Sequence, residues 1–295
     1  MFELKQVTDN VYYIESPAKI GLVKINDQDV VLIDTGNDKD AGRKVRKILD
    51  EKKWNLKAIY NTHSHADHVG GNNYLQNQTH CHIYIPEVEA DFTRHPILEP
   101  SFVYGGYPSK ELRHKFIMAK ESNAEELTPK NLPKGWSTIP IPGHYFNMVA
   151  YRTVDNIIFL ADCLIGKEIL DKYKITFVYD VKSYLSTLEM IKTLKADLFI
   201  PSHAEPTKDI TELAQINIDQ TLKIANDILT ICNEPNTFES IQKKLFDMYQ
   251  LKLTIDQSLP CGCTIRSYLS WLVDEKKLDR YVDDNLILYR VSQKS

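Results

Sequence analysis

Several features that define special classes of protein are absent from this chain of 295 residues. No apolar run approaches the roughly 18 residues that a membrane-spanning helix needs, so we expect no association with a membrane. The first residues contain no basic stretch followed by an apolar one, so we expect no secretion signal and a cytoplasmic location. Only 5 cysteines are present, without the spacing of a disulfide framework, which favours reduced thiols.

The chain also lacks an excess of positive charge. Its formal net charge is −4 at pH 7, while its hydrophobic content of 43% and charged content of 26% are ordinary for a globular protein. Phosphate-binding surfaces usually carry the opposite sign, so the charge favours a small-molecule substrate over nucleic acid. The length predicts one large domain, or one domain with an appendage.

A dense histidine cluster is the most informative stretch that is present. His63, His65, Asp67 and His68 fall within six residues, directly after an apolar run that ends at Tyr60. A short strand that runs into a tight turn would hold such side chains on one lip of a cleft. Imidazole and carboxylate together are ligands for divalent metals of borderline softness, zinc first among them. A loop that is rich in histidine by chance is a much weaker explanation.

The pattern around this cluster is that of an α/β protein. Short β-prone runs occupy residues 7–34, and the apolar run at 30–33 is expected of a strand buried on both faces. Apolar spacing then predicts a helix at 40–53, a strand at 56–60, a helix at 68–76 and a strand at 80–85 that carries His80 and His82 on one face. Asp34 follows the buried strand, where it either caps the next helix or supports a metal ligand.

The second half repeats this arrangement of apolar strands that each lead to one metal-competent side chain. Residues 137–144 lead to His144, residues 157–160 to Asp162, and residues 197–200 to His203, with a helix predicted at 182–194. The insertion at about 92–135 is irregular, aromatic and glycine-bearing, with helix-like spacing at 110–120. Such an insertion forms a lid or pocket wall, or equally a contact in a homodimer. His95 and His114 within it are expected on the surface.

After His203 the pattern changes to helices and a hairpin. Helices are predicted at 210–232, 238–249 and 264–277, with a loop before the last and an alternating strand around Leu286 and Leu288. This order resembles a small winged-helix module over residues 231–295. Residues 209–295 contain 13 acidic and 10 basic side chains, which favours packing, dimerisation or a wall of the substrate cleft over nucleic-acid binding.

The ordered set of motifs resembles the metallo-β-lactamase superfamily. It comprises Asp34-Thr35-Gly36, the histidine cluster at 63–68, and then His144, Asp162 and His203. The resemblance covers about residues 7–208. It implies a four-layer αββα sandwich, a hydrolase domain over residues 1–230, and a site at the rim where strand ends from both halves converge.

The resemblance also implies a binuclear metal site. The ligands of the first ion would be His63, His65 and His144, and those of the second Asp67, His68 and His203, with Asp162 bridging the two. We expect two divalent ions, with zinc preferred and iron or manganese compatible with the same ligands. A glutamate at position 65 would indicate redox-active diiron relatives, so His65 favours hydrolysis.

The implied reaction is attack on a carbonyl or phosphoryl centre by a hydroxide that bridges the metals. Asp67 would also orient this nucleophile and carry a proton. We expect a small thioester, ester or lactone as substrate, and the alternatives are a nuclease of the same superfamily and a non-catalytic metal-binding module. Tyr145 and Phe146 stand where the family commonly has small residues, and with Tyr104 and Tyr107 of the insertion they are expected to line the substrate pocket.

Overall fold

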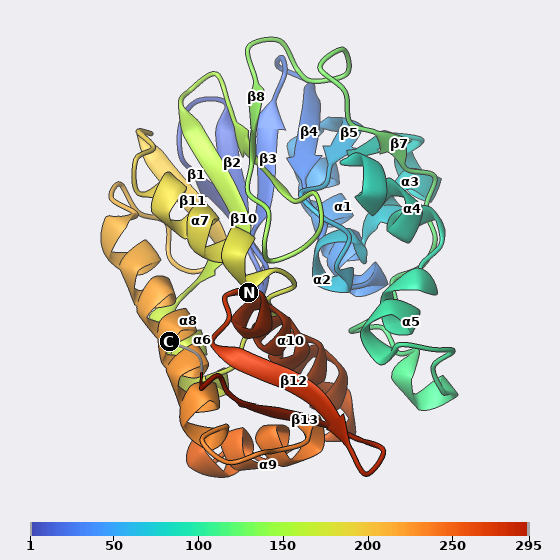
Figure 1. The fold of residues 1–295 in the computed structure, drawn as a ribbon. Helices are drawn as coiled ribbons and strands as arrows, with labels where there is room; N and C mark the ends of the chain where they lie inside the picture. The colour runs from blue at the N-terminus through green and yellow to red at the C-terminus, as the bar shows by residue number, and fades with distance from the viewer. Residues whose placement is uncertain (1, 294–295) are drawn as a thin grey trace.

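Two β-sheets face each other at the centre of the structure, a computed structural model that describes residues 2–293 (Figure 1). The first sheet contains β1 (Glu3–Gln6), β2 (Val11–Glu15), β3 (Ile20–Lys24), β4 (Asp29–Ile33), β5 (Asn55–Tyr60), β6 (His82–Ile85) and β7 (Glu125–Glu126), paired in that order. The second sheet contains β8 (Ser137–Pro140), β9 (Val149–Arg152), β10 (Ile157–Ile165) and β11 (Leu198–His203), in the order β11-β10-β9-β8.

Helices cover the outer face of each sheet, which confirms the predicted αββα sandwich. On the first sheet these are α1 (Lys39–Lys52), α3 (Asn72–Thr79) and α4 (Glu87–Arg94), and on the second α7 (Val181–Ile191) and α8 (Thr211–Ile231) (Figure 1). No helix within residues 2–293 combines the length and apolarity required to cross a membrane.

Alternating side chains of the strands fill the three interfaces between these four layers. In β4, Val30 and Leu32 pack under the helices of the first sheet, whereas Val31 and Ile33 pack between the sheets. Ile158 and Phe159 of β10 divide in the same way between the outer helices and the inter-sheet core. Because successive side chains of a strand point to opposite faces, a strand in the middle of four layers must be apolar on both.

The boundaries predicted for the helix at 68–76 are wrong, because the helix is interrupted at Gly70 and Gly71. A short helix, α2 (Ala66–Val69), precedes α3. A Cβ atom on Gly70 would lie 2.2 Å from the carbonyl carbon of Asn37, and one on Gly71 would lie 2.5 Å from the carbonyl oxygen of Thr35. The two glycines therefore let this turn pass against the loop after β4. His80 ends α3 with a φ of +56° and lies outside β6, contrary to expectation.

The strand expected at 157–160 is longer than predicted, so Asp162 lies within β10 rather than after it. A bulge separates Phe159 from Ala161, whose φ of +49° lies in the left-handed region. Pairing with β11 resumes beyond the bulge, where Ile165 is opposite His203. The irregular backbone re-aims the side chain of Asp162 while the strand continues.

The insertion also differs from its prediction. Its helix is α5 (Leu98–Tyr104), and residues 110–120 contain only the 3-10 turn η1 (Lys110–Leu112). His114, expected on the surface, is half-buried, and its Nε2 lies 3.2 Å from Oδ1 of Asp256.

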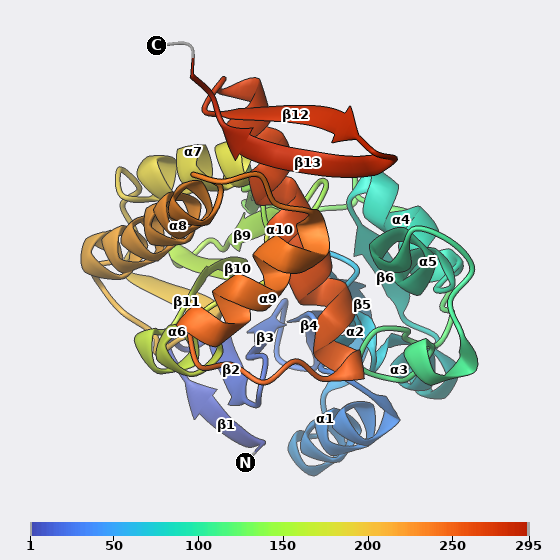
Figure 2. The same ribbon diagram turned by 60° about the horizontal axis from the view of Figure 1, so that its bottom comes forward.

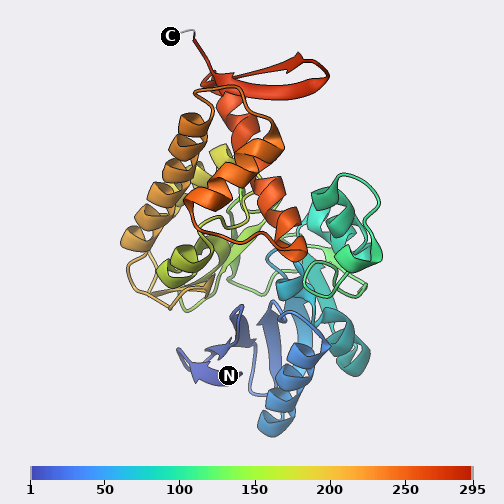
Figure 3. The ribbon, with the colours of Figure 1, turned by 90° about the horizontal axis from the view of Figure 1, so that it is seen from below.

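The C-terminal elements lie across one end of the sandwich. They are α9 (Phe238–Met248), α10 (Ile255–Asp274), β12 (Leu278–Asp283) and β13 (Leu286–Val291). The loop expected before residue 264 is wrong, because Thr254 caps α10 by accepting a hydrogen bond from the Gln257 amide and the helix continues through Pro260. Figures 2 and 3 show α10 between α8 on one side and α5 on the other, and α10 contacts both.

A single apolar core joins these elements to the second sheet. Leu160 of β10, Leu188 of α7, Ile228 of α8, Leu245 of α9 and Leu269 of α10 belong to one buried cluster. The helix-helix-hairpin order expected for residues 231–295 is present. The division into domains at residues 230 and 231, and the winged-helix assignment, stay predictions.

Candidate metal centre

Seven side chains that were predicted as ligands converge at one end of the two sheets. They come from the loop after β5 with α2, from the loop between β8 and β9, from the bulged β10 and from the last residue of β11. Within the described residues they form two groups, whose ligand atoms lie within 4.8 Å of one another: His63, His65 and His144, and then Asp67, His68, Asp162 and His203.

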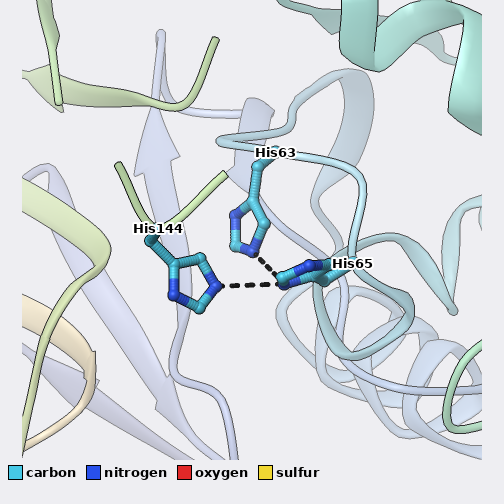
Figure 4. A group of neighbouring side chains, drawn as sticks. All are labelled: His63, His65 and His144. Atoms are coloured by element: carbon cyan, nitrogen blue, oxygen red, sulfur yellow. Dashed lines mark hydrogen bonds between the residues drawn. The ribbon is translucent and has the colours of Figure 1, made fainter. Parts of the chain in front are cut away.

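The first group consists of three histidines whose ring nitrogens face a common point (Figure 4). Nδ1 of His65 lies 3.1 Å from Nε2 of His63 and 3.0 Å from Nε2 of His144. Two nitrogens bound to one tetrahedral zinc at about 2.05 Å are about 3.3 Å apart, so the spacing is close to that of a metal site. Burial lowers the pKa of all three rings, that of His65 to about 3. The imidazoles are thus neutral at pH 7, the form that binds metals.

The second group alternates histidines with carboxylates. Nε2 of His203 lies 3.2 Å from Oδ2 of Asp67 and 3.2 Å from Oδ2 of Asp162. Nε2 of His68 lies 3.1 Å from Oδ1 of Asp162, yet both atoms are buried without a hydrogen-bond partner. A divalent cation would satisfy both atoms, so the residues fit the metal that their chemistry implies.

The strong electrostatic interactions within the second group also indicate a site that fits a divalent cation. Burial disfavours every charge there, but the carboxylates of Asp162 and Asp67 outweigh it and raise the pKa of His203 to about 10. The same carboxylates, with Asp34, hold the pKa of His68 well above its usual range. Against the cost of burial, His68 and His203 in turn lower the pKa of both aspartates. Two ionised carboxylates beside two histidines that hold their protons tightly form a site in which a cation can replace those protons.

Asp162 stands between the two groups. Besides its contacts with His68 and His203, its Oδ2 lies 3.6 Å from Nε2 of His144 in the first group. For Asp67, the other carboxylate among the ligands, the contacts within 4.0 Å are with His68 and His203 of its own group. Its position is that required of a bridging ligand, and the bridge itself stays a prediction.

Asp34 supports the second group from behind, and the alternative that it caps α1 is wrong. Its Oδ2 lies 2.8 Å from Nδ1 of His68, while its carboxylate also accepts hydrogen bonds from the amide and hydroxyl of Thr62 and from the side chain of Asn61. The cap of α1 is Asp38, which accepts a hydrogen bond from the Ala41 amide. Asp34 takes up a φ of +63°, which turns its side chain toward the loop after β5.

Two buried glutamates were not anticipated from the sequence. Glu89 of α4 accepts hydrogen bonds from the Ser64 amide at 3.1 Å, the Ser64 hydroxyl at 2.6 Å and the Asn147 amide at 3.1 Å, so it joins the two loops that carry the first group. Glu99 of α5 accepts a hydrogen bond from the Tyr145 hydroxyl, and its Oε1 lies 3.5 Å from Nε2 of His65. Burial raises the pKa of Glu89 to about 7 and that of Glu99 to about 8.

Little in the sequence marks these glutamates. Glu89 lies between the exposed Glu87 and Asp91 in one acidic helix. Glu99 shares a helical face with Val103, four residues on, which is a weak indication of burial.

The four aromatic residues expected at the substrate pocket are not brought together there. Tyr145 is 0% exposed, and its ring centroid lies 4.2 Å from that of His65. It can be buried because its hydroxyl donates a hydrogen bond to Glu99 in the interior. Phe146 packs against Tyr179 with the ring centroids 4.3 Å apart. Tyr104 lines a separate cleft between α5 and α10. Tyr107 is 73% exposed beside Arg113.

Two cavities adjoin the ligand cluster instead. The smaller has a volume of about 150 Å³ and is lined by His65, Ala66, Asp67, Glu99, Val103, Phe116, Ile117, Phe177 and Pro260. The larger, of about 460 Å³, lies at His203 between the loop after β2 and the segments that follow β10 and β11. Its charged lining residues are Glu15, Lys19, Lys167, Glu168, Glu205, Asp209 and Glu212. The cluster is therefore reached from an apolar cavity and from a predominantly acidic one.

Comparison with known proteins gives a consistent result. A family model described as the metallo-beta-lactamase superfamily matches residues 13–203. Probable metallo-hydrolase YybB from Bacillus subtilis (strain 168) is 27% identical over 214 residues, which cover 68% of this chain and 91% of that protein. A hydroxyacylglutathione hydrolase from Methylobacillus flagellatus is 28% identical over 123 residues, 41% of this chain and 39% of that protein.

Solved structures resemble the fold as a whole. The structure of a metallo-beta-lactamase family protein from Thermus thermophilus has a TM-score of 0.73 at 16% sequence identity. The match covers 97% of this chain and 100% of that one, so it extends into the C-terminal elements.

Proposed function

This chain belongs to the metallo-beta-lactamase superfamily, and we propose that it is a hydrolase with two divalent metal ions, zinc preferred, that acts on a small thioester, ester or lactone. The observation that carries the proposal is a pair of buried, unpartnered atoms, Nε2 of His68 and Oδ1 of Asp162, within the second of two adjacent groups of ligands. A purely structural zinc site normally has four protein ligands that close its coordination sphere. Seven ligands in two adjacent groups that border on cavities favour catalysis instead.

The division of labour among the residues follows from their contacts. His63, His65 and His144 would hold the first ion, and Asp67, His68 and His203 the second, with Asp162 shared. Bound divalent ions supply Lewis acidity and lower the pKa of water toward 7.

The chain's own groups position the substrate and move protons. The side chain of Asp67 is 39% exposed, so its carboxylate reaches the smaller cavity and can accept a proton at Oδ1 or Oδ2 and return it to a leaving group. Asp34 and Glu89 hold His68 and the loop of Ser64 in place, which keeps the ligands in one geometry.

The choice of a thioester or ester over nucleic acid rests on charge. Five carboxylates and two lysines line the larger cavity at His203, so a polyanion that approached there would be repelled. One relative is a hydroxyacylglutathione hydrolase, a name that denotes action on a thioester. A nuclease remains the alternative that a substrate panel tests directly.

The test combines metal analysis with that panel. We expect the purified protein to hold about two equivalents of zinc, iron or manganese by mass spectrometry, Asp162→Ala to lose both with its activity, and His144→Ala to lose one. His95→Ala, at an exposed histidine outside both groups, is the matched control and should retain both. The panel contains thioesters, esters, lactones and short RNA. Full activity without stoichiometric metal, or cleavage of RNA alone, would overturn the proposal.

A further inference from the structure

The smaller cavity beside His65 and Asp67 is apolar over most of its wall. Its apolar side chains come from five separate segments, namely Ala66 of α2, Val103 of α5, Phe116 and Ile117 after η1, Phe177 before α7, and Pro260 of α10. The polar groups that reach it are His65 and Asp67 of the ligand cluster and Glu99. Among its described lining residues none is a lysine or an arginine.

The wall of this cavity is held in place by its own packing. Val103, Leu112 and Leu259 form a buried cluster, against which Ile117 and Phe177 pack. Two polar contacts link the intervening segment to other parts of the chain. Nε2 of His114 lies 3.2 Å from Oδ1 of Asp256 in α10, and Lys115 forms an ion pair at 2.8 Å with Asp38 at the start of α1. The insertion and the C-terminal helix, which are far apart in sequence, thus form one preformed wall beside the ligands.

The size and charge of the cavity define what it can hold. An apolar cavity of about 150 Å³ accommodates a hydrocarbon of the size of benzene, which has about six carbon atoms. The ionisable side chains that line this cavity are Asp67, Glu99 and His65. A carboxylate or phosphate of the substrate in the cavity would therefore be repelled by an acidic side chain or left without a charged partner.

We propose that this cavity binds an uncharged, apolar acyl group of up to about six carbon atoms, and so sets the acyl specificity of the hydrolase. The inference rests on the proposed function and deepens it. With a thioester, the carbonyl carbon gains a bond to the oxygen of water and loses its bond to sulfur. One proton of the water goes to the departing sulfur and the other is lost from the acid, so the products are a carboxylate, a thiol and a proton.

The test is a series of N-acetylcysteamine thioesters presented to the metal-loaded protein. From acetyl to hexanoyl we expect kcat/KM to rise by about four-fold per methylene, the factor that burial of one methylene supplies, and to fall for decanoyl. Succinyl, which has the length of butyryl and a terminal carboxylate, should be a much poorer substrate than butyryl. Equal rates for acetyl, butyryl, hexanoyl and succinyl thioesters would overturn the inference.

Two variants at one position change the volume in opposite directions. Val103→Phe fills the cavity and should abolish the preference for hexanoyl over acetyl, whereas Val103→Ala should move the preferred chain to greater length. Val282→Phe, on the exposed hairpin, is the matched control and should leave the profile unchanged. Folding of each variant is checked by circular dichroism, and Val103→Ala keeps the inference testable if the phenylalanine is not accommodated. If both variants changed kcat/KM by the same factor for every acyl length, the inference would be overturned.

Calorimetric titration with acetate, butyrate and hexanoate gives a readout that does not depend on turnover. We expect affinity for the metal-loaded protein to rise with chain length by the same factor, and this rise to be lost in Val103→Phe. If hexanoate bound more tightly than acetate but no thioester, ester or lactone was hydrolysed, the proposed function would be overturned and the inference of an acyl-binding site would stand. Hydrolysis of thioesters with a flat binding series would overturn the acyl site and leave the proposed function.

Discussion

Oδ2 of Asp34 lies 2.8 Å from Nδ1 of His68, on the opposite side of the imidazole ring from the nitrogen that faces Asp162. With a proton on Nδ1 donated to this carboxylate, Nε2 keeps a lone pair for a metal. The same carboxylate accepts hydrogen bonds from Asn61 and Thr62, so it ties the end of β4 to the loop that carries the histidines. One side chain thus fixes both the orientation and the protonation state of a ligand.

Asp34→Asn should therefore weaken metal binding without removing a ligand. An amide keeps the size of the carboxylate but has lost its charge and one of its acceptor oxygens, and the loss of such a partner typically costs 10- to 100-fold in metal affinity. Competition with a chromophoric chelator measures the affinity, and Asp40→Asn at an exposed position of α1 is the control. Unchanged affinity in Asp34→Asn would show that His68 needs no such support.

A second prediction concerns the buried pair of Tyr145 and Glu99. Tyr145→Phe removes the hydrogen bond to Glu99 and should destabilise the protein by about 1–3 kcal/mol, the cost of a buried polar group left without its partner. Burial raises the pKa of Glu99 to about 8 and the tyrosine opposes that rise, since its hydrogen bond favours the charged carboxylate. The cost of the substitution should therefore grow from pH 7 to pH 9. Urea unfolding in the presence of a chelator measures it, with Tyr173→Phe at a well-exposed ring as control.

Glu89 gives a prediction for the dependence of stability on pH. Burial raises its pKa from 4.5 to about 7, so between these values the folded protein binds more protons than the unfolded chain. Stability must then fall as pH rises through this window, by up to on the order of 3 kcal/mol from this group. Glu89→Gln should lack this component, so the difference in unfolding free energy between variant and wild type should shift in favour of the variant from pH 4.5 to pH 7.

The control for Glu89 is its exposed neighbour on the same helix. Glu87→Gln changes the same charge at the surface and should leave the pH profile parallel to that of the wild type. Chelator is included in all samples, so that competition between protons and metal does not contribute. Parallel profiles for Glu89→Gln as well would mean that Glu89 has the same pKa in the folded protein as in the unfolded chain.

The residues of the site that could be predicted are those whose chemistry is visible locally or in chain order. His63, His65 and His68 are close in sequence, and each of His144, Asp162 and His203 comes shortly after an apolar run. Since the carboxyl ends of parallel strands lie at the same edge of a sheet, side chains far apart in the chain can be assigned to one place. The structure brings these residues together in two groups.

What could not be predicted depends on which side chains tertiary packing buries. Glu89 and Glu99 look like surface glutamates until α4 and α5 are placed over the loops of Ser64 and Tyr145. Pro260 is typical of a loop, but α10 continues through it, and its neighbour Leu259 is buried in a cluster with Val103 of α5. The apolar cavity is lined by residues of both α5 and α10, which are separated by more than half the chain. The sequence of either segment alone therefore does not predict it.

The shared core of α10 and β10 leads to a last prediction, about cooperativity. Leu269 of α10 is buried in the same cluster as Leu160 of β10, so Leu269→Ala should cost about 2–5 kcal/mol. The loss should reach the whole molecule, because an element that shares its core with the sandwich cannot unfold while the sandwich remains packed. Hydrogen exchange followed by mass spectrometry along a urea gradient should show peptides of α10 and β10 losing protection together, at a lower urea concentration in the variant. Leu286→Ala, at an exposed leucine of the hairpin, should leave that concentration unchanged. If α10 lost protection well before β10, residues 231–295 would be a domain of independent stability, and the wall that Pro260 contributes to the acyl cavity could open without unfolding the metal centre.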